Sequence, residues 1–405
     1  MKALRGLGLA TILALAAGPA HAQWSDGVIK IGVLTDMSSL YTDLSGAGSV
    51  LAARLAVEDF GAAAKGMKIE IVNADHQNKA DVGSTIARQW YDVDKVDVIV
   101  DTPNSGVALA VTEITREKNK VFLVSGAASS ALTSDKCTAN TIHWTYDTWA
   151  LANGTGRAIV KTGGDTWFFL TADYAFGHAL EADTENVVKE LNGKVLGKVR
   201  HPLNTADFSS FLLQAQASKA KIIGMANAGG DTINTIKQSA EFGIVKGGQN
   251  LAGLLVFLTD VHALGLKTAQ GLIFTESWYW DANDANRAFA ARFSAANKGI
   301  HPTMIHAGVY SAVTHYLKSL EALKSDADGK AVVEKMKATP TDDRLFGKGT
   351  IRADGRKIHD MYLFEVKKPE ESKKPWDYYK LRATIPAAEA FRPIDKGNCP
   401  LVKKS

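Results

Sequence analysis

The sequence predicts an α/β protein in which mostly parallel sheets are covered by helices on both faces. Short runs rich in β-branched and aromatic residues alternate with helix-spaced apolar stretches along most of the 405 residues. Such alternation is typical of parallel sheets that are buried between helices. The alternation starts again after residue 146, and a single core usually stops growing near about 250 to 300 residues. We therefore expect two doubly wound α/β units of similar size.

The first unit shows its elements through the spacing of its apolar residues. A short alternating or continuous apolar run indicates a strand, and apolar residues three and four apart indicate a helix. In chain order we expect a strand at 28–35, a helix at 50–60, a strand at 68–72, a helix at 82–91, a strand at 96–100, a helix at 107–116 and a strand at 121–124.

The second unit repeats the pattern after a transitional stretch at 142–146. No low-complexity linker separates the units, so we expect short extended crossovers between them. In chain order we expect a helix at 149–161, a strand at 167–171, a helix at 179–191, a strand at 194–199, a helix at 208–217, a strand at 221–226, a helix at 232–242, a strand at 251–257, mainly helix at 285–338, and strands at 348–352 and 361–366.

The N-terminus has the features of a secretory signal peptide. A basic start with Lys2 and Arg5 precedes an apolar run at 7–17, and Ala20-His21-Ala22 forms a small-residue cleavage site. We predict a signal peptide at 1–22, cleaved after Ala22, and export to the periplasm. The apolar run is far shorter than the roughly 20 residues that span a bilayer, and no later apolar segment reaches that length.

Composition and motifs argue against several classes of protein. The 47 Lys and Arg nearly balance the 43 Asp and Glu, which indicates no nucleic-acid surface. The sequence lacks the GxSxG, HExxH, GxxxxGK[ST] and GxGxxG motifs, and its ten histidines show no metal-ligand spacing. We therefore predict no catalytic residues, no metal and no cofactor. A triad assembled from distant residues, as in an exported α/β hydrolase, stays an alternative.

Two cysteines, Cys137 and Cys399, are present in a chain expected to reach an oxidising compartment. They are too few for a CxxC metal site or for a small disulfide-held fold. We expect one long-range disulfide that ties the C-terminal tail to the loop after Ser134. The alternative is two unrelated buried thiols.

Candidate ligand-binding residues follow the predicted strands, because ligands of open α/β sheets bind beyond the carboxyl ends of the strands. Asn104 and Ser105 follow the strand at 96–100, and a small-residue loop at 125–130 follows the next strand. Tyr41 lies after the first strand and could form an aromatic wall. Free N–H groups at helix N-termini and small-residue turns suit a carboxylate, and ordinary helix capping is the alternative for either loop.

Several segments resemble one known family in their order along the chain. They extend over almost the whole mature chain, from about residue 28 to 366, and the similarity is to the branched-chain amino acid type of periplasmic solute-binding protein of ABC transporters. The segments are Ile29-Lys-Ile-Gly-Val33 with Met37-Ser38, Ala52-Ala-Arg-Leu-Ala-Val-Glu-Asp59, Val98-Ile-Val100 and Thr171-Ala-Asp-Tyr-Ala-Phe-Gly177.

The resemblance implies a type I periplasmic-binding fold, in which two lobes joined by three crossovers close on a small molecule by hinge bending. The crossovers are expected near 145–147, 275–280 and 350–353. The N-terminal lobe is then 23–146 with 278–350, and the C-terminal lobe is 147–277 with 351–405. The implied partners are a small carboxylate ligand and the permease subunits of an ABC importer. The binding protein itself is expected to be a monomer.

The family also implies positions for the site. A hydroxyl residue and a small-residue loop hold the ligand carboxylate in the family, and these positions fall here on Asn104 or Ser105 and on residues 127–129. A tyrosine of the family corresponds to Phe176, with Tyr174 nearby. The candidate ligand-binding residues are Tyr41, Asn104, Ser105, Ala127, Ala128, Ser129, Tyr174, Phe176, Asn227, Asp231 and Phe257.

One departure from the family affects the predicted ligand. Members that bind amino acids hold the ammonium group with an acidic residue at the end of the strand matching 251–257, which here is entirely apolar. Burying an unpaired ammonium costs on the order of several kcal/mol. Asp231 and Asp260 are the nearest substitutes for this acidic residue. The presumed cleft is also close to several aromatic residues, which are Tyr41, Phe176, Phe257, Trp278 and Trp280. We expect the ligand to be an aromatic acid, with a branched-chain amino acid as the second choice.

The competing classes of protein are an exported hydrolase and the sensing domain of a signalling system.

Overall fold

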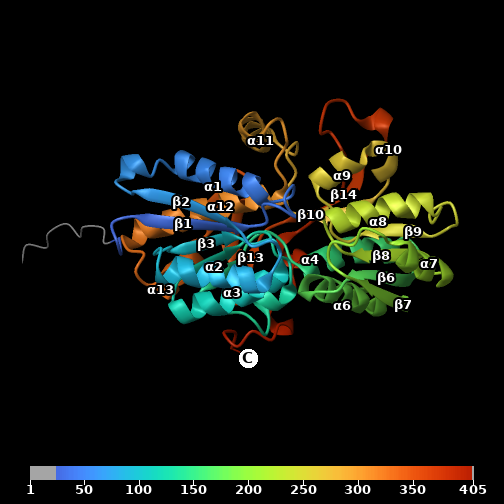
Figure 1. Ribbon diagram of the computed structural model, residues 1–405, viewed down its shortest axis with the longest axis horizontal. Coiled ribbons are helices and arrows are strands. Elements are labelled where there is room, and N and C mark those ends of the chain that lie inside the picture. The colour runs from blue at the N-terminus through green and yellow to red at the C-terminus, as the bar shows by residue number, and fades with distance from the viewer. Residues whose placement is uncertain (1–23, 404–405) are drawn as a thin grey trace, which may run out of the picture.

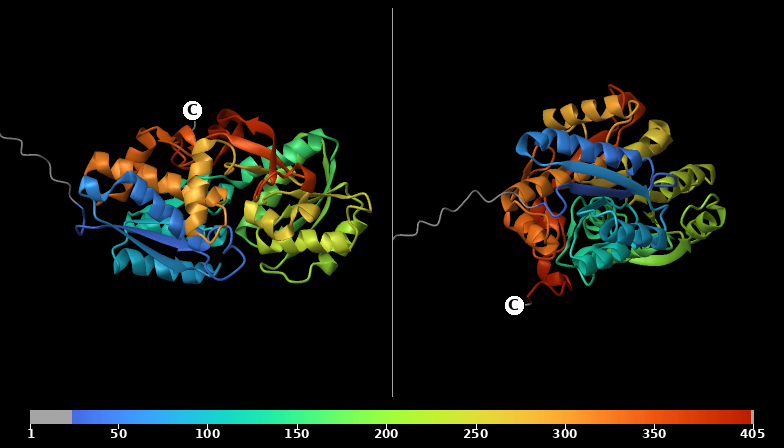
Figure 2. Two further views of the ribbon diagram at one scale, coloured as in Figure 1. Left: turned by 90° about the horizontal axis from the view of Figure 1, so that it is seen from above. Right: turned by 60° about the vertical axis from the view of Figure 1, so that its left-hand side comes forward.

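The computed structural model describes residues 24–403. The predicted signal peptide at 1–22 and its cleavage after Ala22 lie outside the described residues. Two lobes lie side by side: the first is mainly blue, cyan and orange, and the second is green and yellow (Figure 1). Seen from above, the red C-terminal segment lies along their junction (Figure 2). Within the described part of the chain, every helix is too short or too polar to cross a membrane.

The first lobe is built on a five-stranded parallel sheet with the strand order β2-β1-β3-β4-β5. Its central strands are mostly apolar and almost entirely buried because helices cover both faces. The register pairs Ile31 with Val98 and Val98 with Val121. The strands are β1 Ile29–Thr35, β2 Ile69–Asp75, β3 Val98–Asp101, β4 Val121–Val124 and β5 Thr141–His143.

Helices cover the two faces of this sheet in pairs. Helices α1 and α12 pack together on one face, and α2 and α3 pack together on the other (Figure 1). Successive residues of a strand pack into different buried clusters on the two faces of the sheet. Val33 and Val98 belong to one cluster, and Leu34 and Ile99 belong to the other. The helices of this lobe are α1 Gly46–Phe60, η1 Ala63–Lys65, α2 Ala80–Asp92, α3 Ser105–Lys118, η2 Ser130–Thr133, α11 Asp284–Ala296, α12 Met304–Leu323 and α13 Gly329–Ala338.

The second lobe is built on a four-stranded parallel sheet with the order β7-β6-β8-β9. Within β6, Trp167 and Phe169 face one buried cluster while Phe168 and Leu170 face another. This alternation shows that the sheet is covered on both faces. The elements are α4 Thr148–Leu151, η3 Ala152–Gly156, α5 Arg157–Lys161, β6 Thr166–Ala172, α6 Ala175–Glu190, β7 Lys194–His201, α7 Ser209–Ala217, β8 Ile222–Ala226, α8 Gly230–Glu241, β9 Asn250–Gly253, α9 Leu258–Leu264 and α10 Leu266–Ala269.

Two small antiparallel sheets complete the described chain. One has the order β10-β14-β15, and the other has the order β11-β12-β13. The elements are β10 Ile273–Glu276, β11 Thr341–Asp343, β12 Gly347–Ile351, β13 Lys357–Ile358, β14 Met361–Val366, η4 Pro369–Glu371, β15 Tyr379–Ile385, α14 Ala387–Ala390 and η5 Ile394–Lys396.

The α/β class and the doubly wound lobes are confirmed, and three local predictions need correction. The predicted strand at 251–257 is wrong in its second half, because β9 ends at Gly253. The transitional stretch at 142–146 overlaps the edge strand β5, which begins at Thr141. The third crossover lies at 359–360 rather than near 350–353, because β12 turns back into β13 before the chain enters β14. The lobe boundaries stay a prediction.

The predicted disulfide is confirmed between Cys137 and Cys399, which lie 262 residues apart. The tail that it holds also bonds to the first lobe. Arg392 Nη2 donates to the carbonyls of Ser130 and Thr133, and the backbone N–H of Asn398 donates to Ser134 Oγ at 3.1 Å. Although the predicted second lobe includes the tail, its last residues therefore contact the first.

Candidate ligand-binding site

A cavity lies between the two lobes, at the carboxyl ends of both parallel sheets. Its first-lobe wall follows β1, β3, β4 and β5, and its second-lobe wall follows β6, β8 and β9. This is the position expected for a ligand site in open α/β sheets. The lining residues are Tyr41, Leu44, Pro103, Gly126, Ala128, Tyr146, Tyr174, Phe176, Ala228, Leu255 and Phe257.

Side chains from opposite lobes meet across this cavity. The hydroxyls of Tyr41 and Tyr174 are hydrogen-bonded to each other, and the backbone N–H of Gly230 donates to the carbonyl of Leu40 at 3.4 Å. The space left inside is about 10 Å³, about enough for one water molecule. The lobes are therefore closed on each other, and a ligand must separate these side chains to enter.

The wall of the cavity is aromatic and apolar. Tyr146 donates its hydroxyl hydrogen to the carbonyl of Gly126 at 2.6 Å, and its ring packs edge-on against Phe257. Tyr174 and Phe176 lie with ring centroids 5.9 Å apart. Burial raises the pKa values of Tyr41 and Tyr174, so both phenols stay neutral and can donate hydrogen bonds.

The small-residue loop after β4 offers backbone N–H groups beside this wall, and Ser105 already accepts two of them. Ser105 Oγ lies 3.3 Å from the N–H nitrogen of Ala128 and 3.1 Å from that of Ser129. The carbonyl of Ala127 accepts from His143 Nε2 at 2.8 Å. A carboxylate at this loop would compete with Ser105 Oγ for the two N–H groups.

Asn104 caps helix α3 instead of lining the cavity. Its Oδ1 accepts from the N–H groups of Gly106 and Val107 at 2.9 and 3.1 Å. Ser129 likewise caps the short helix η2 through Ala131. Both side chains therefore cap helices, which was the alternative to carboxylate binding at these two loops.

The polar candidates of the second lobe also have structural partners. Asn227 Oδ1 accepts from Thr232 Oγ1 at 2.8 Å, and its amide donates to Thr235 Oγ1. Asp231 accepts from the N–H groups of Asn204 and Thr205, and burial raises its pKa to about 6. Neither residue lines the cavity.

Asp260 and the two tryptophans expected near the cleft lie elsewhere. Asp260 caps helix α9 by accepting from the N–H of Phe257 at 2.9 Å, and burial raises its pKa to about 7. Trp278 packs edge-on against Phe289, and Trp280 donates its indole hydrogen to the carbonyl of Trp376. Of the eleven candidates, the cavity wall contains Tyr41, Ala128, Tyr174, Phe176 and Phe257.

Comparison with known proteins connects this geometry to a family. The family model for the periplasmic binding protein matches residues 28–373. The chain belongs to the periplasmic binding protein family. Its members are substrate-binding proteins of ABC transporters, and the family implies a periplasmic location.

Solved structures show the same fold as this periplasmic binding protein. A periplasmic binding protein from Burkholderia mallei is 54% identical, with a TM-score of 0.91, and the match covers 93% of this chain and 100% of that chain. A branched chain amino acid ABC transporter periplasmic ligand-binding protein from Burkholderia xenovorans LB400 is 40% identical, with a TM-score of 0.81, covering 92% and 99%. A solute binding protein from R. palustris in complex with benzoate is 23% identical, with a TM-score of 0.78, covering 89% and 97%.

Six lining residues of this binding protein were not predicted from the sequence. Tyr146 follows β5, a three-residue strand with too few residues to show a period. Leu255 lies in the apolar run predicted to be a strand, and it follows the end of β9. The six are Leu44, Pro103, Gly126, Tyr146, Ala228 and Leu255.

Asp101, the last residue of β3, is a buried carboxyl group directly behind the cavity wall. A Cβ atom at position 126 would lie 2.7 Å from Asp101 Oδ1, so only glycine fits there. Among the described residues neither carboxyl oxygen has a partner in hydrogen-bonding geometry. Burial raises the pKa of Asp101 to about 7, and the nearby hydroxyls of Thr35 and Ser49 offset this only partly.

We expect Asp101→Asn to remove a pH dependence of stability. The folded protein keeps a proton on Asp101 up to about pH 7, whereas an unfolded aspartate releases it near about pH 4. Asp101 therefore stabilises the fold below about pH 4, and this contribution is lost as the pH rises toward 7. Urea unfolding from about pH 4.5 to about pH 8 should show the wild type losing stability relative to Asp101→Asn. Parallel pH profiles would contradict this.

Proposed function

We propose that the protein captures an aromatic carboxylate between its two lobes and delivers it to the permease subunits of an ABC importer. One observation carries the proposal. Tyrosine, phenylalanine, leucine, proline, alanine and glycine form the cavity wall, and no acidic residue of the described chain lines it. An aromatic ring gains apolar contact from such a wall and brings no ammonium group that needs a partner charge.

The carboxylate end of the ligand is proposed to bind at the loop after β4. The N–H groups of Ala128 and Ser129, now bonded to Ser105 Oγ, lie beside the N-terminus of α3. Backbone N–H groups and the positive end of a helix stabilise a negative charge. The hydroxyls of Tyr41 and Tyr174, which bond to each other across the cavity, become available for a polar substituent on the ring once the lobes separate.

A branched-chain amino acid is the second candidate ligand, because the Burkholderia xenovorans relative is described as a branched-chain amino acid transporter component. Its ammonium would need a carboxylate at the cavity. The acidic candidates from the sequence, Asp231 and Asp260, already accept backbone hydrogen bonds outside the wall, and Asp101 lies behind Gly126. The R. palustris protein supports the first candidate, since it shows that this fold accepts benzoate.

We expect benzoate or 4-hydroxybenzoate to bind at least about tenfold more tightly than leucine, which corresponds to about 1.4 kcal/mol. The physical reason is the absence of a partner for the leucine ammonium on the wall. Isothermal titration calorimetry of the purified protein with each ligand measures the difference. Micromolar binding of leucine or valine without binding of either benzoate would reject the proposal and favour Asp231 or Asp260 as the ammonium partner.

A pair of matched variants locates the binding event. Phe257→Leu changes the cavity wall, whereas Phe211→Leu makes the same change on helix α7, where Phe211 packs against Phe208. Weaker benzoate binding in the first variant alone would place the ligand between the lobes. Equal effects of the two variants would argue for binding elsewhere.

A further inference from the structure

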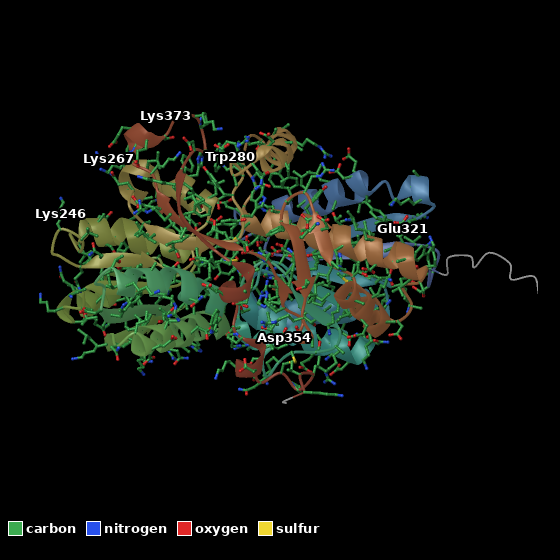
Figure 3. All side chains as sticks on the ribbon, turned by 180° about the vertical axis from the view of Figure 1, so that it is seen from behind. Lys246, Lys267, Trp280, Glu321, Asp354 and Lys373 are labelled. Carbon is green, nitrogen blue, oxygen red and sulfur yellow. A yellow bond between two sulfur atoms is a disulfide. The ribbon has the colours of Figure 1, made fainter. Side chains whose placement is uncertain are left out.

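The loop at 367–378, which joins β14 to β15, lies at the junction of the two lobes and is named the strap below. Figure 3 labels Lys373 of the strap at the top of the molecule, close to Trp280 of the second crossover. An ion pair between Lys367 and Asp377 ties the two ends of the strap together. The backbone N–H of Lys373 also donates to Asp377 Oδ2 at 2.9 Å. The strap is therefore held in one conformation by its own contacts.

One side chain of the strap, Trp376, stacks on a histidine from each lobe. Trp376 is 7% exposed, although residues 373–375 directly before it are exposed. Its ring is nearly parallel to that of His262 on helix α9, with an interplanar angle of 10° and centroids 3.9 Å apart. It also stacks on His301, in the loop between α11 and α12, with an interplanar angle of 14° and centroids 5.1 Å apart. Helix α9 belongs to the second lobe and α11 and α12 belong to the first, so one indole contacts both lobes.

Contacts with the second crossover fix the backbone of the strap at this point. The carbonyl of Trp376 accepts from Trp280 Nε1 at 2.9 Å and from the Tyr279 hydroxyl at 3.2 Å. Lys374 Nζ lies 2.9 Å from Asp281 Oδ2. Trp376 has a φ of 66°, in the left-handed region that bulky residues rarely adopt. Such a conformation persists only where the surroundings hold it, and here they hold the indole against the two histidines.

Both histidines lie on segments that lead to the wall of the cavity between the lobes. Helix α9 begins directly after Phe257, a wall residue from the second lobe. Thr303, which follows His301 closely, donates from Oγ1 to the carbonyl of Leu44, a wall residue from the first lobe, at 2.8 Å. Opening the cavity moves His262 and His301 apart, because they belong to different lobes. The indole of the strap cannot stay stacked on both, so its two stacks stabilise the closed form.

We propose that the strap is a clasp that holds the two lobes closed through the stacking of Trp376 on His262 and His301. Loss of either stack then shifts the equilibrium toward the open form, whichever ligand the cavity binds. The alternative is that these contacts stabilise only the strap itself. Removing the indole would then loosen residues 367–378 and leave the lobes in place.

Small-angle X-ray scattering of the ligand-free protein measures this equilibrium. We expect the wild type to scatter as the closed structure and Trp376→Ala to have a larger radius of gyration. His262→Ala and His301→Ala each remove one stack and should increase the radius of gyration as well. Trp24→Ala is the matched control, because it makes the same change at a half-buried tryptophan outside the strap. It should keep the wild-type radius of gyration.

Circular dichroism shows whether each variant folds, and the two histidine variants decide the test if Trp376→Ala does not. The same radius of gyration in the wild type and in every folded variant would overturn the proposal, because the contacts would then stabilise the strap alone. An equal increase in Trp24→Ala would overturn it as well, since opening would then follow a general loss of stability. A wild type that scatters as an open form would also contradict it. Because no ligand is added, none of these results depends on the ligand proposed above.

Discussion

Changing Arg356 to Met is expected to lower the free energy of unfolding by about 3 to 5 kcal/mol, the usual cost of breaking a buried charged network. Arg356 is 0% exposed and connects the turn between β12 and β13 to the first crossover. Its guanidinium donates to the carbonyls of Trp144 at 2.5 Å and Tyr146 at 2.9 Å, and it lies 3.6 Å from Asp147 Oδ2. Methionine keeps the apolar stem but leaves these acceptors and the carboxylate without their donor. Urea unfolding followed by circular dichroism measures the loss.

The matched control for this variant is Arg382→Met. Arg382 is 48% exposed, and its Nε lies 3.4 Å from Glu365 Oε2. An exposed ion pair of this kind contributes about 0 to 1 kcal/mol, so the control should stay close to the wild type. If Arg356→Met also unfolds within about 1 kcal/mol of the wild type, the guanidinium does not stabilise the junction between the β12–β13 turn and the first crossover.

Removing the disulfide by the double change Cys137→Ala and Cys399→Ala is expected to lower the free energy of unfolding by about 3 to 5 kcal/mol. The bond closes a loop with a sequence separation of 262 residues, which strongly restricts the unfolded chain. It also holds the tail, through which Arg392 bonds to the carbonyls of Ser130 and Thr133. Urea unfolding under non-reducing conditions, for the wild type and the double variant, measures the difference.

Reductant provides the control for the disulfide. Dithiothreitol should shift the unfolding midpoint of the wild type toward that of the double variant and leave the double variant unchanged. A wild-type midpoint that is the same with and without reductant, while mass spectrometry shows two free thiols, would contradict the prediction.

The fold was predictable because its sheets are parallel and covered on both faces. This geometry produces short apolar strands, such as 121–124, separated by amphipathic helices, and the pattern is visible in one sequence. The strand prediction for 251–257 fails in part because a buried loop beside a cavity is as apolar as a buried strand. Periodicity cannot separate the two when the run has only a few residues.

The site was predictable only in part, for a different reason. The rule that ligands bind beyond strand ends located Tyr41, Tyr174 and Phe257 on the wall. The same rule selected Asn104 and Asp231, whose oxygens accept from backbone N–H groups. A sequence shows that a side chain can accept a hydrogen bond, but the local backbone geometry decides whether the donor is the chain itself or a ligand.

The disulfide also makes most of the protein a covalent ring. Between Cys137 and Cys399 the chain passes through all three crossovers, forms the whole second parallel sheet and returns to the first lobe. A protease that cuts one surface loop inside this ring leaves both pieces joined through sulfur, and the lobes stay tethered. Two cuts, or one cut followed by reduction, are needed to release a fragment. In an extracytoplasmic compartment that contains proteases, a binding protein built this way survives a first nick in its second lobe.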